Sequence, residues 1–147
     1  LAIIDRKNNL VKLATGEFVA LEALESAYSS SKYVSNICVV AAAHMARPCA
    51  IVNMDPTMVA HWAAEAQLPR ADETADTRPF CALVYQDLMA VARHSGLRGQ
   101  QLLADVRIDP DLWTPENGML TAASKLRRPA IHRRNASKLD EMNPPTS

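Results

Sequence analysis

The chain has 147 residues, of which 48% are hydrophobic and 22% are charged. This composition fits one globular domain with a core of its own, with two very small domains as the alternative, and excludes disordered, collagen-like and disulfide-dense proteins. Sixteen Lys and Arg balance sixteen Asp and Glu, so the overall charge does not predict a nucleic-acid binder. Because only 5% of residues are aromatic, we expect a mainly aliphatic core.

The cysteines and the apolar runs bound the environment of the chain. Cys38, Cys49 and Cys81 form an odd set without CxxC spacing, which argues against a disulfide framework and a zinc cluster. We therefore expect an intracellular location and no metal site. The longest apolar run, residues 37–43, is far shorter than the roughly 20 residues of a membrane span. The chain begins with Leu1 inside an apolar run, so we expect a fragment of a longer protein.

Taken in chain order, the first third alternates short strands with a helix. An apolar run at 1–4 and alternating residues at 10–13 predict two short strands joined by a polar connection. Residues 19–28 carry apolar side chains at helical spacing, which predicts an amphipathic helix. Residues 36–43 and 49–54 are apolar on both faces and predict two neighbouring buried strands.

The middle of the chain predicts two helices separated by a loop. Asp55 followed by Pro56 is typical of a helix start, and helical spacing then continues toward Pro69. Residues 69–79 are charged, bounded by prolines and without periodicity, which predicts a surface loop. The next apolar stripe begins at Phe80 and ends before Ser95 and Gly96, a pair typical of a helix C-terminus.

The last third predicts one more strand and one more helix. Residues 101–109 supply the strand, residues 113–124 form an irregular segment, and a helix runs from about 128 to 142. Residues 143–147 are expected to fray. The predicted fold class is therefore α+β, a small leading β-hairpin followed by a three-stranded sheet flanked by helices.

One stretch of the chain carries only basic charges. Between Asn117 and Leu139 lie Lys125, Arg127, Arg128, Arg133, Arg134 and Lys138, with no acidic residue among them. Such a field attracts an anion, and a solvated helix face is the alternative. Nucleic acid is less favoured, because no aromatic side chains interleave with the charges. Lys125 follows small residues beside an Asn-Gly turn, and a lysine on such a loop can meet a phosphate as a point charge.

Familiar catalytic motifs are absent from the sequence. The four histidines have no HExxH spacing, no GxSxG marks a nucleophilic serine, and no glycine-rich loop is present to cradle phosphates. Zinc hydrolase and serine hydrolase chemistry are therefore not supported.

Two segments resemble a known family. The segment "IIDRKNNLVK" at residues 3–12, followed by "GEFVALEALE", and "WTPENGMLTAASKLRR" at 113–128 are similar to the C-terminal domain of long-chain fatty acyl-CoA synthetases, with a fungal character. These enzymes belong to the adenylate-forming superfamily. The resemblance implies an interdomain linker and first hairpin at 1–12, a mobile C-terminal domain at 13–142, and a tail at 143–147.

The resemblance also implies a function. Such enzymes activate a fatty acid with ATP and Mg²⁺ to an acyl-adenylate and then transfer the acyl group to coenzyme A. The implied partner is the N-terminal adenylation domain of the same protein, which holds most of the ATP and Mg²⁺ site. No nucleic-acid partner is expected. The parent enzyme would be cytoplasmic or attached to an organelle membrane through regions outside this chain. A non-catalytic module that binds nucleic acid or lipid through residues 125–138 is the alternative.

Position by position, the linker and the first turn carry part of the implied site. Arg6 is expected to contact the ribose of the nucleotide, and Lys12 to lie near AMP. Asn8 takes the hinge position, where relatives usually carry Lys or Asp; asparagine still tolerates unusual backbone angles. Gly16, Glu17 and Phe18 match a turn that faces the active site in the thioester-forming pose.

The second segment carries the implied catalytic residue. Lys125 matches the lysine that reaches the substrate carboxylate and the α-phosphate during adenylation, and Arg128 takes the family's basic position after it. Pro129 departs from the Lys or Asp usual there, although proline is compatible with the first turn of a helix.

Overall fold

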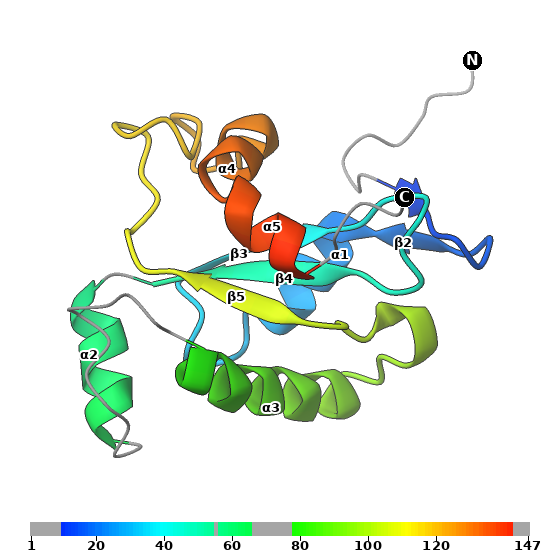
Figure 1. The fold of residues 1–147 in the computed structure, drawn as a ribbon, viewed down its shortest axis with the longest axis horizontal. Coiled ribbons are helices and arrows are strands. Elements are labelled where there is room, and N and C mark those ends of the chain that lie inside the picture. The colour runs from blue at the N-terminus through cyan, green and yellow to red at the C-terminus, as the bar shows by residue number, and fades with distance from the viewer. Residues whose placement is uncertain (1–9, 55, 66–77, 143–147) are drawn as a thin grey trace.

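The computed structural model describes residues 10–54, 56–65 and 78–142. The predicted strand at 1–4, most of the predicted loop and the tail at 143–147 lie outside the described residues, as do Arg6, Asn8 and Asp55. Within them the fold class is confirmed: a two-stranded hairpin precedes a three-stranded sheet, with helices around it. Figure 1 shows this arrangement.

The three-stranded sheet has the order β3-β4-β5. β3 (Asn36–Val40) pairs antiparallel with β4 (Cys49–Asn53), and β4 pairs parallel with β5 (Val106–Asp109). Every residue of the central strand β4 is buried, which explains why its sequence is apolar on both faces. The predicted strands at 36–43 and 49–54 are confirmed, but each ends earlier than predicted.

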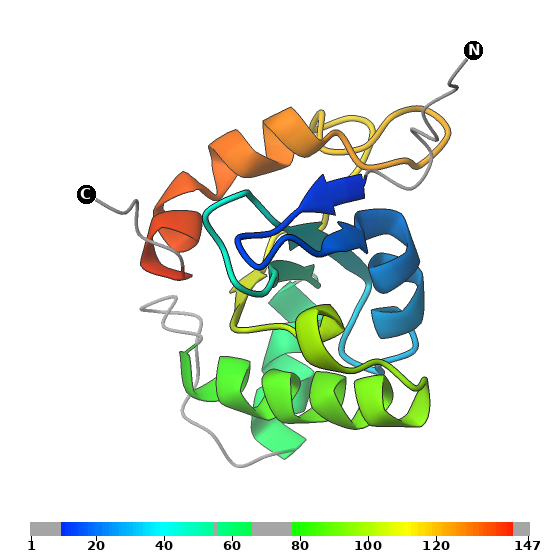
Figure 2. The ribbon, with the colours of Figure 1, turned by 90° about the vertical axis from the view of Figure 1, so that its right-hand side faces the viewer.

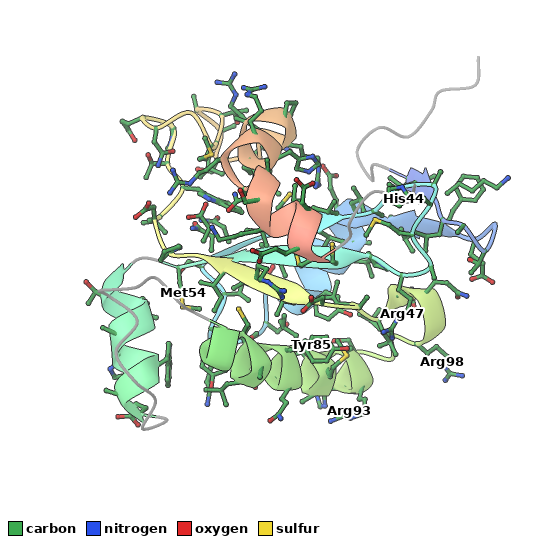
Figure 3. All side chains as sticks on the ribbon, in the orientation of Figure 1. His44, Arg47, Met54, Tyr85, Arg93 and Arg98 are labelled. Carbon is green, nitrogen blue, oxygen red and sulfur yellow. The ribbon has the colours of Figure 1, made fainter. Side chains whose placement is uncertain are left out.

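The third predicted strand, at 101–109, was too long. A 3₁₀ helix, η1 (Gly99–Gln101), opens this segment, and β5 starts only at Val106. The carbonyl groups in between are bonded by side chains: the Tyr28 hydroxyl donates to Gln101 O at 2.8 Å and the Tyr85 hydroxyl to Leu103 O at 2.8 Å. Figure 3 shows Tyr85 on the helix below the sheet. Two tyrosine hydroxyls therefore bond carbonyl groups of the segment before β5, and backbone bonds toward β4 begin only at Ala104, whose N–H donates to Pro48 O at 2.7 Å.

The leading hairpin forms with a different partner strand. β1 (Leu10–Lys12) pairs antiparallel with β2 (Phe18–Ala20). The sequence pattern predicted a turn up to Phe18 and a helix from residue 19 in place of β2. Consequently α1 (Leu21–Tyr28) begins at Leu21 and not at residue 19. Gly16 has φ +89° in the connecting turn, where its N–H donates to Leu13 O at 2.9 Å. A left-handed backbone there favours glycine.

Alternation along the strands divides the core between the two faces of the sheet. Val39, Val52 and Ile108 belong to one buried cluster, to which α1 and α3 (Arg78–His94) contribute Leu24 and Leu88. Cys38 and Ile51 belong to the other, with Trp113, Leu120 and Ile131. Figure 2 shows α3 on one side of the sheet, and α4 (Arg128–Arg134) and α5 (Ala136–Met142) on the other. The segment at 113–128, which contains Lys125, thus packs on the face opposite α3.

The central helices follow the predictions closely. α2 (Pro56–Glu65) has Pro56 at its first position, and Trp62 packs edge-on against Tyr33 with ring centroids 5.2 Å apart. α3 begins at Arg78, so Pro79 lies in the first turn of this helix and not in the predicted loop. After α3, Gly96 has φ +81° and the Leu97 N–H donates to Ala92 O at 2.9 Å, which closes the helix as predicted.

The predicted helix at 128–142 is interrupted at Asn135. This residue is 1% exposed, and its side-chain Nδ2 donates to Ile131 O at 2.9 Å and to Asp109 Oδ2 at 3.2 Å. Because the side chain shares a helix carbonyl with the backbone and bonds a strand residue, the chain bends into α4 and α5. Within the described part of the chain, no helix is long and apolar enough to cross a bilayer.

Candidate functional site

Lys125 lies at the end of a short loop that is closed by its own hydrogen bonds. The Thr121 N–H donates to Lys125 O at 2.8 Å, the Lys125 N–H donates to Thr121 Oγ1 at 3.1 Å, and the Ser124 N–H donates to Thr121 O at 2.8 Å. Ser124 has φ 65°, a conformation uncommon for a residue with a side chain. The side chain of Lys125 is exposed. The loop therefore presents an ammonium group to the outside on a defined backbone.

We call residues 120–126 the lysine loop. The base of the lysine loop is anchored in the core. Leu120 and Leu126 form an isolated antiparallel bridge, and the Arg127 N–H donates to Met119 O at 2.9 Å. Leu120 is buried in the same cluster as Trp113 and Ile131. The lysine loop thus stands on a packed stem and is not a free surface connection.

A buried polar network holds the segment that leads into the lysine loop. The Asn53 Oδ1 accepts the Trp113 N–H at 2.9 Å, and Asn53 Nδ2 donates to Asp109 O at 2.9 Å and to Asp111 O at 2.8 Å. Trp113 Nε1 donates to Asp109 Oδ2 at 2.8 Å. One side chain on β4 and one on β5 therefore satisfy the irregular backbone of residues 109–113.

Asp109 is the most connected carboxylate of this network. Its oxygens accept hydrogen bonds from Arg134 Nε at 2.8 Å, from Trp113 Nε1 and from Asn135 Nδ2. Burial alone would raise the pKa of Asp109, but the hydrogen bonds from Arg134, Trp113 and the Asp111 N–H hold it below its ordinary value. The carboxylate therefore stays charged and ties α4 to β5.

The basic stretch at 125–138 is not unopposed once the chain is folded. Arg128 makes a two-pronged ion pair with Glu25, with Nη2 to Oε1 at 2.7 Å and Nη1 to Oε2 at 2.8 Å. Arg134 pairs with Asp109 and Asp111. The prediction of an uninterrupted positive field was therefore wrong, because its opposing carboxylates come from distant parts of the sequence. The stretch also carries exposed Lys125, Arg127 and Arg133 and half-buried Lys138.

Arg128 is a half-buried cation that is paired with Glu25. Burial by itself lowers the pKa of its guanidinium, but the hydrogen bonds and charge of Glu25 outweigh this and raise it. Arg128 also begins α4, with Pro129 directly after it in the first turn, as the sequence allowed. Its place at the junction of the lysine loop and α4 connects the loop to the body of the domain.

The predicted site residues of the leading hairpin, Lys12 and residues 16–18, form a separate exposed surface. Lys12 and Phe18 are opposite each other in the register of β1 and β2, and Leu10 lies on the same face as Lys12. Phe18 is 63% exposed and Leu10 is 54% exposed, whereas Val19 on the other face is buried. The structure brings Lys12 and Phe18 together, and Gly16 and Glu17 form the adjoining exposed turn.

The hairpin and the lysine loop do not meet. In Figure 1 the hairpin lies at one end of the molecule, whereas the segment of the lysine loop, between β5 and α4, lies toward the opposite side. Within residues 10–54, 56–65 and 78–142, no hydrogen bond or ion pair joins Lys125 to Gly16, Glu17 or Phe18. The two groups therefore form separate surfaces of the domain.

Sequence reasoning missed Glu25, which belongs to this site through Arg128. A signal was present: Glu25 shares the buried stripe of α1 with Leu21, Leu24 and Tyr28. A carboxylate within an apolar helix stripe needs a partner, since burying an unpaired charge is costly. The pattern does not identify that partner, which lies far along the chain.

The described residues offer no obvious metal centre or reactive thiol. Within the parts of the chain that the structure covers, no group of three or more metal-ligating side chains is found. Cys38, Cys49 and Cys81 are buried, and none of the three forms a disulfide bond. Burial raises the pKa of both Cys38 and Cys49 to about 12, so these thiols remain protonated and unreactive at neutral pH.

Curated relatives of this chain include two fungal long-chain-fatty-acid–CoA ligases. Long-chain-fatty-acid–CoA ligase 3 of Saccharomyces cerevisiae is 38% identical over 135 residues, which are 89% of this chain and 20% of that protein. Long-chain-fatty-acid–CoA ligase 1 of Schizosaccharomyces pombe is 41% identical over 144 residues, 95% of this chain and 21% of that protein. The chain thus spans about one fifth of the length of these curated relatives. No protein-family model matches it.

Solved structures of adenylation domains contain a part with a fold similar to that of this chain. The A domain of the carboxylic acid reductase of Segniliparus rugosus, in complex with AMP and a co-purified carboxylic acid, matches with a TM-score of 0.75 and 30% identity. The match covers 95% of this chain and 20% of that one. The adenylation domain of the carboxylate reductase of Mycobacterium chelonae matches with a TM-score of 0.76 and 28% identity, over 94% and 20% of the two chains.

Proposed function

Because the chain belongs to the family of long-chain-fatty-acid–CoA ligases and forms the C-terminal domain of such an adenylate-forming enzyme, we propose that it serves both half-reactions of fatty-acid activation. In the first, a fatty-acid carboxylate attacks the α-phosphorus of ATP, giving an acyl-adenylate and pyrophosphate. In the second, the thiol of coenzyme A attacks the acyl carbon, giving the thioester and AMP. The exposed Lys125 on its anchored lysine loop is the observation that carries the proposal.

Lys125 is proposed as the catalytic residue of the first half-reaction. A lysine ammonium is a compact charge that can contact a carboxylate oxygen and an α-phosphate oxygen at once. Such a group accelerates the reaction by stabilising the charge that develops in the transition state, provided that it is held in place beforehand. The closed lysine loop supplies the fixed backbone, and the four-carbon stem supplies the reach.

The hairpin surface is proposed to face the active site in the second half-reaction. Its exposed Phe18 and Leu10 lie on one face of the hairpin together with Lys12, and neighbouring exposed apolar side chains of this kind suit a contact with another protein surface. The partner is the N-terminal adenylation domain of the same protein. Gly16, Glu17 and Phe18 would lie nearest the acyl-adenylate, and Arg6 and Lys12 would contact the nucleotide.

Two surfaces at different places on one rigid domain require a rotation of that domain between the half-reactions. We assign the pivot to Asn8, in the linker that precedes β1. ATP, Mg²⁺, the fatty acid and coenzyme A are proposed to bind mostly to the N-terminal domain. We place the parent enzyme inside the cell, in the cytoplasm or attached to an organelle membrane by regions outside this chain.

The isolated chain is expected to fold but not to turn over. Its core is packed on both faces of the sheet, whereas the main surfaces for ATP and fatty acid belong to the remainder of the protein. The measurement is pyrophosphate release with ATP and oleate, alongside a thermal unfolding curve of the same sample. A cooperative transition without pyrophosphate release is expected; catalytic turnover by the purified chain would contradict the proposal.

Replacing Asn8 with Pro in the parent enzyme is expected to slow thioester formation more than adenylation. Proline restricts φ to about −65° and removes a hydrogen-bond donor, so a residue whose backbone angles must change between poses can no longer change freely. Adenylation would be followed by pyrophosphate release and the second step by thioester formation from supplied acyl-adenylate. Equal loss in both steps would show that Asn8 is not the pivot, and Asn8→Ala, which does not fix φ, serves as the control.

A further inference from the structure

The ion pair between Glu25 and Arg128 lies at the foot of the lysine loop. The Arg128 side chain is 18% exposed and that of Glu25 is 11% exposed, so the pair is largely removed from water. Arg128 follows Lys125 by three positions, and Glu25 lies on α1, on another part of the chain. Two parallel hydrogen bonds fix the relative orientation of the two side chains, not only their distance.

The same pair also binds the free edge of the sheet. β3 is an edge strand, and its Val39 N–H donates to Glu25 Oε2 at 2.8 Å. Arg128 Nη1 lies 3.4 Å from Val39 O and 3.7 Å from Cys38 Sγ. Glu25 thus accepts from the edge backbone and Arg128 donates to it, as a neighbouring strand would. Three parts of the domain, α1, β3 and the foot of the lysine loop, are joined at one point.

Glu25 also lies close to the second functional surface along the chain. β2, which carries Phe18, ends at Ala20, and α1 starts at the next residue. α1, whose Glu25 binds Arg128, is therefore a direct continuation of the hairpin. Through the pair, the lysine loop and the hairpin become parts of one rigid body, which is what a domain that presents each of them in turn requires.

We propose that Glu25 is a positioning residue for adenylation, which holds Lys125 in its reactive place through the two-pronged pair with Arg128. This inference rests on the proposed role of Lys125. The lysine loop is closed by its own hydrogen bonds and its stem packs through Leu120 and Leu126, but only the pair joins its foot to α1 and β3 among the contacts described above. Loss of the pair removes this link and allows the whole loop to shift, and a displacement of about 1 Å can cost a reaction about 10²-fold. The hairpin keeps its own anchors, Val11 and Val19, in the core.

The test compares Glu25→Gln, Lys125→Ala and the double variant in the full-length ligase that contains this chain. Gln keeps the shape of Glu and an oxygen for the Val39 N–H, so the edge contact is retained while the charge is lost. We expect Glu25→Gln to lower kcat of adenylation by about 10- to 100-fold with the KM for ATP unchanged, while CoA transfer from supplied acyl-adenylate changes by less than about threefold.

The double variant separates positioning from general damage. If Glu25 acts through Lys125, then Glu25→Gln adds less than about threefold to the loss caused by Lys125→Ala, because the group being positioned is already gone. Full additivity, or equal loss in both half-reactions, would overturn the inference. Normal adenylation in Glu25→Gln together with a slow Lys125→Ala would overturn it while leaving the proposed function standing. Normal adenylation in Lys125→Ala would overturn the proposed function and, with it, this inference.

Two further variants complete the design. Arg128→Lys keeps the positive charge but not the planar fork, so it is expected to show the same selective loss of adenylation and tests the pair even if Glu25→Gln folds poorly. Glu141→Gln is the matched control: Glu141 pairs with Arg107 at 3.5 Å, and the Glu141 side chain is 61% exposed. Removing an exposed pair of this kind is expected to leave both half-reactions within about twofold.

Discussion

Lys125→Ala in the parent ligase is expected to slow adenylation by about 10²- to 10³-fold, the usual effect of removing one preorganised electrostatic group from a transition state. CoA transfer from a supplied acyl-adenylate should remain close to normal, because the segment of the lysine loop lies apart from the hairpin, which we propose faces the active site in that pose. Pyrophosphate release in a single turnover measures the first step, and thioester formation measures the second. The side chain is exposed, so the substitution leaves the fold intact.

Two companion variants define what the lysine contributes. Lys125→Arg is expected to be strongly impaired as well, because a planar, bulkier guanidinium does not reproduce a point charge at the end of a flexible stem. Lys138→Ala removes the same charge from α5, away from the lysine loop, and should have little effect on either step. Equal slowing of both steps by Lys125→Ala, or slowing of neither, would refute the assignment of Lys125 to adenylation.

Asp109→Asn is expected to lower the free energy of unfolding by about 3 kcal/mol or more, the largest stability effect that we predict. The Asp109 side chain is 2% exposed and accepts from Arg134, Trp113 and Asn135. An amide in its place loses the charge and turns a donor toward groups that are donors themselves. Urea unfolding of the isolated chain gives the value. Asp111→Asn, at a 64% exposed side chain that also contacts Arg134, is the control and should cost less than about 1 kcal/mol.

The pH dependence of unfolding provides an independent check on Asp109. Its pKa in the folded chain lies below the ordinary value of about 3.9, so the carboxylate contributes stability above about pH 4 that is lost as the pH falls toward the folded pKa. The difference in unfolding free energy between wild type and Asp109→Asn should therefore shrink in acid. A difference that stays constant from about pH 6 to pH 3 would mean that the charge of Asp109 does not stabilise the fold.

Several helices and strands could be predicted from short stretches of the sequence alone. The buried strands β3 and β4 follow from apolar runs, α2 from its proline start, and the end of α3 from its glycine. Residues 113–128 also carried the family motif that pointed to Lys125. Each of these depends on neighbours in the chain: side-chain periodicity, a restricted proline φ, or a left-handed backbone.

The ion-pair partners of the basic residues and the hydrogen-bond partners of the irregular segments depend on tertiary contacts. The basic run at 125–138 reads as unopposed because Glu25 and Asp109, which neutralise Arg128 and Arg134, lie elsewhere in the sequence. The break at Asn135 has the same cause, since the side chain that interrupts the helix bonds a residue of β5. A buried carboxylate requires a partner, but its identity depends on which segments the packed sheet brings together.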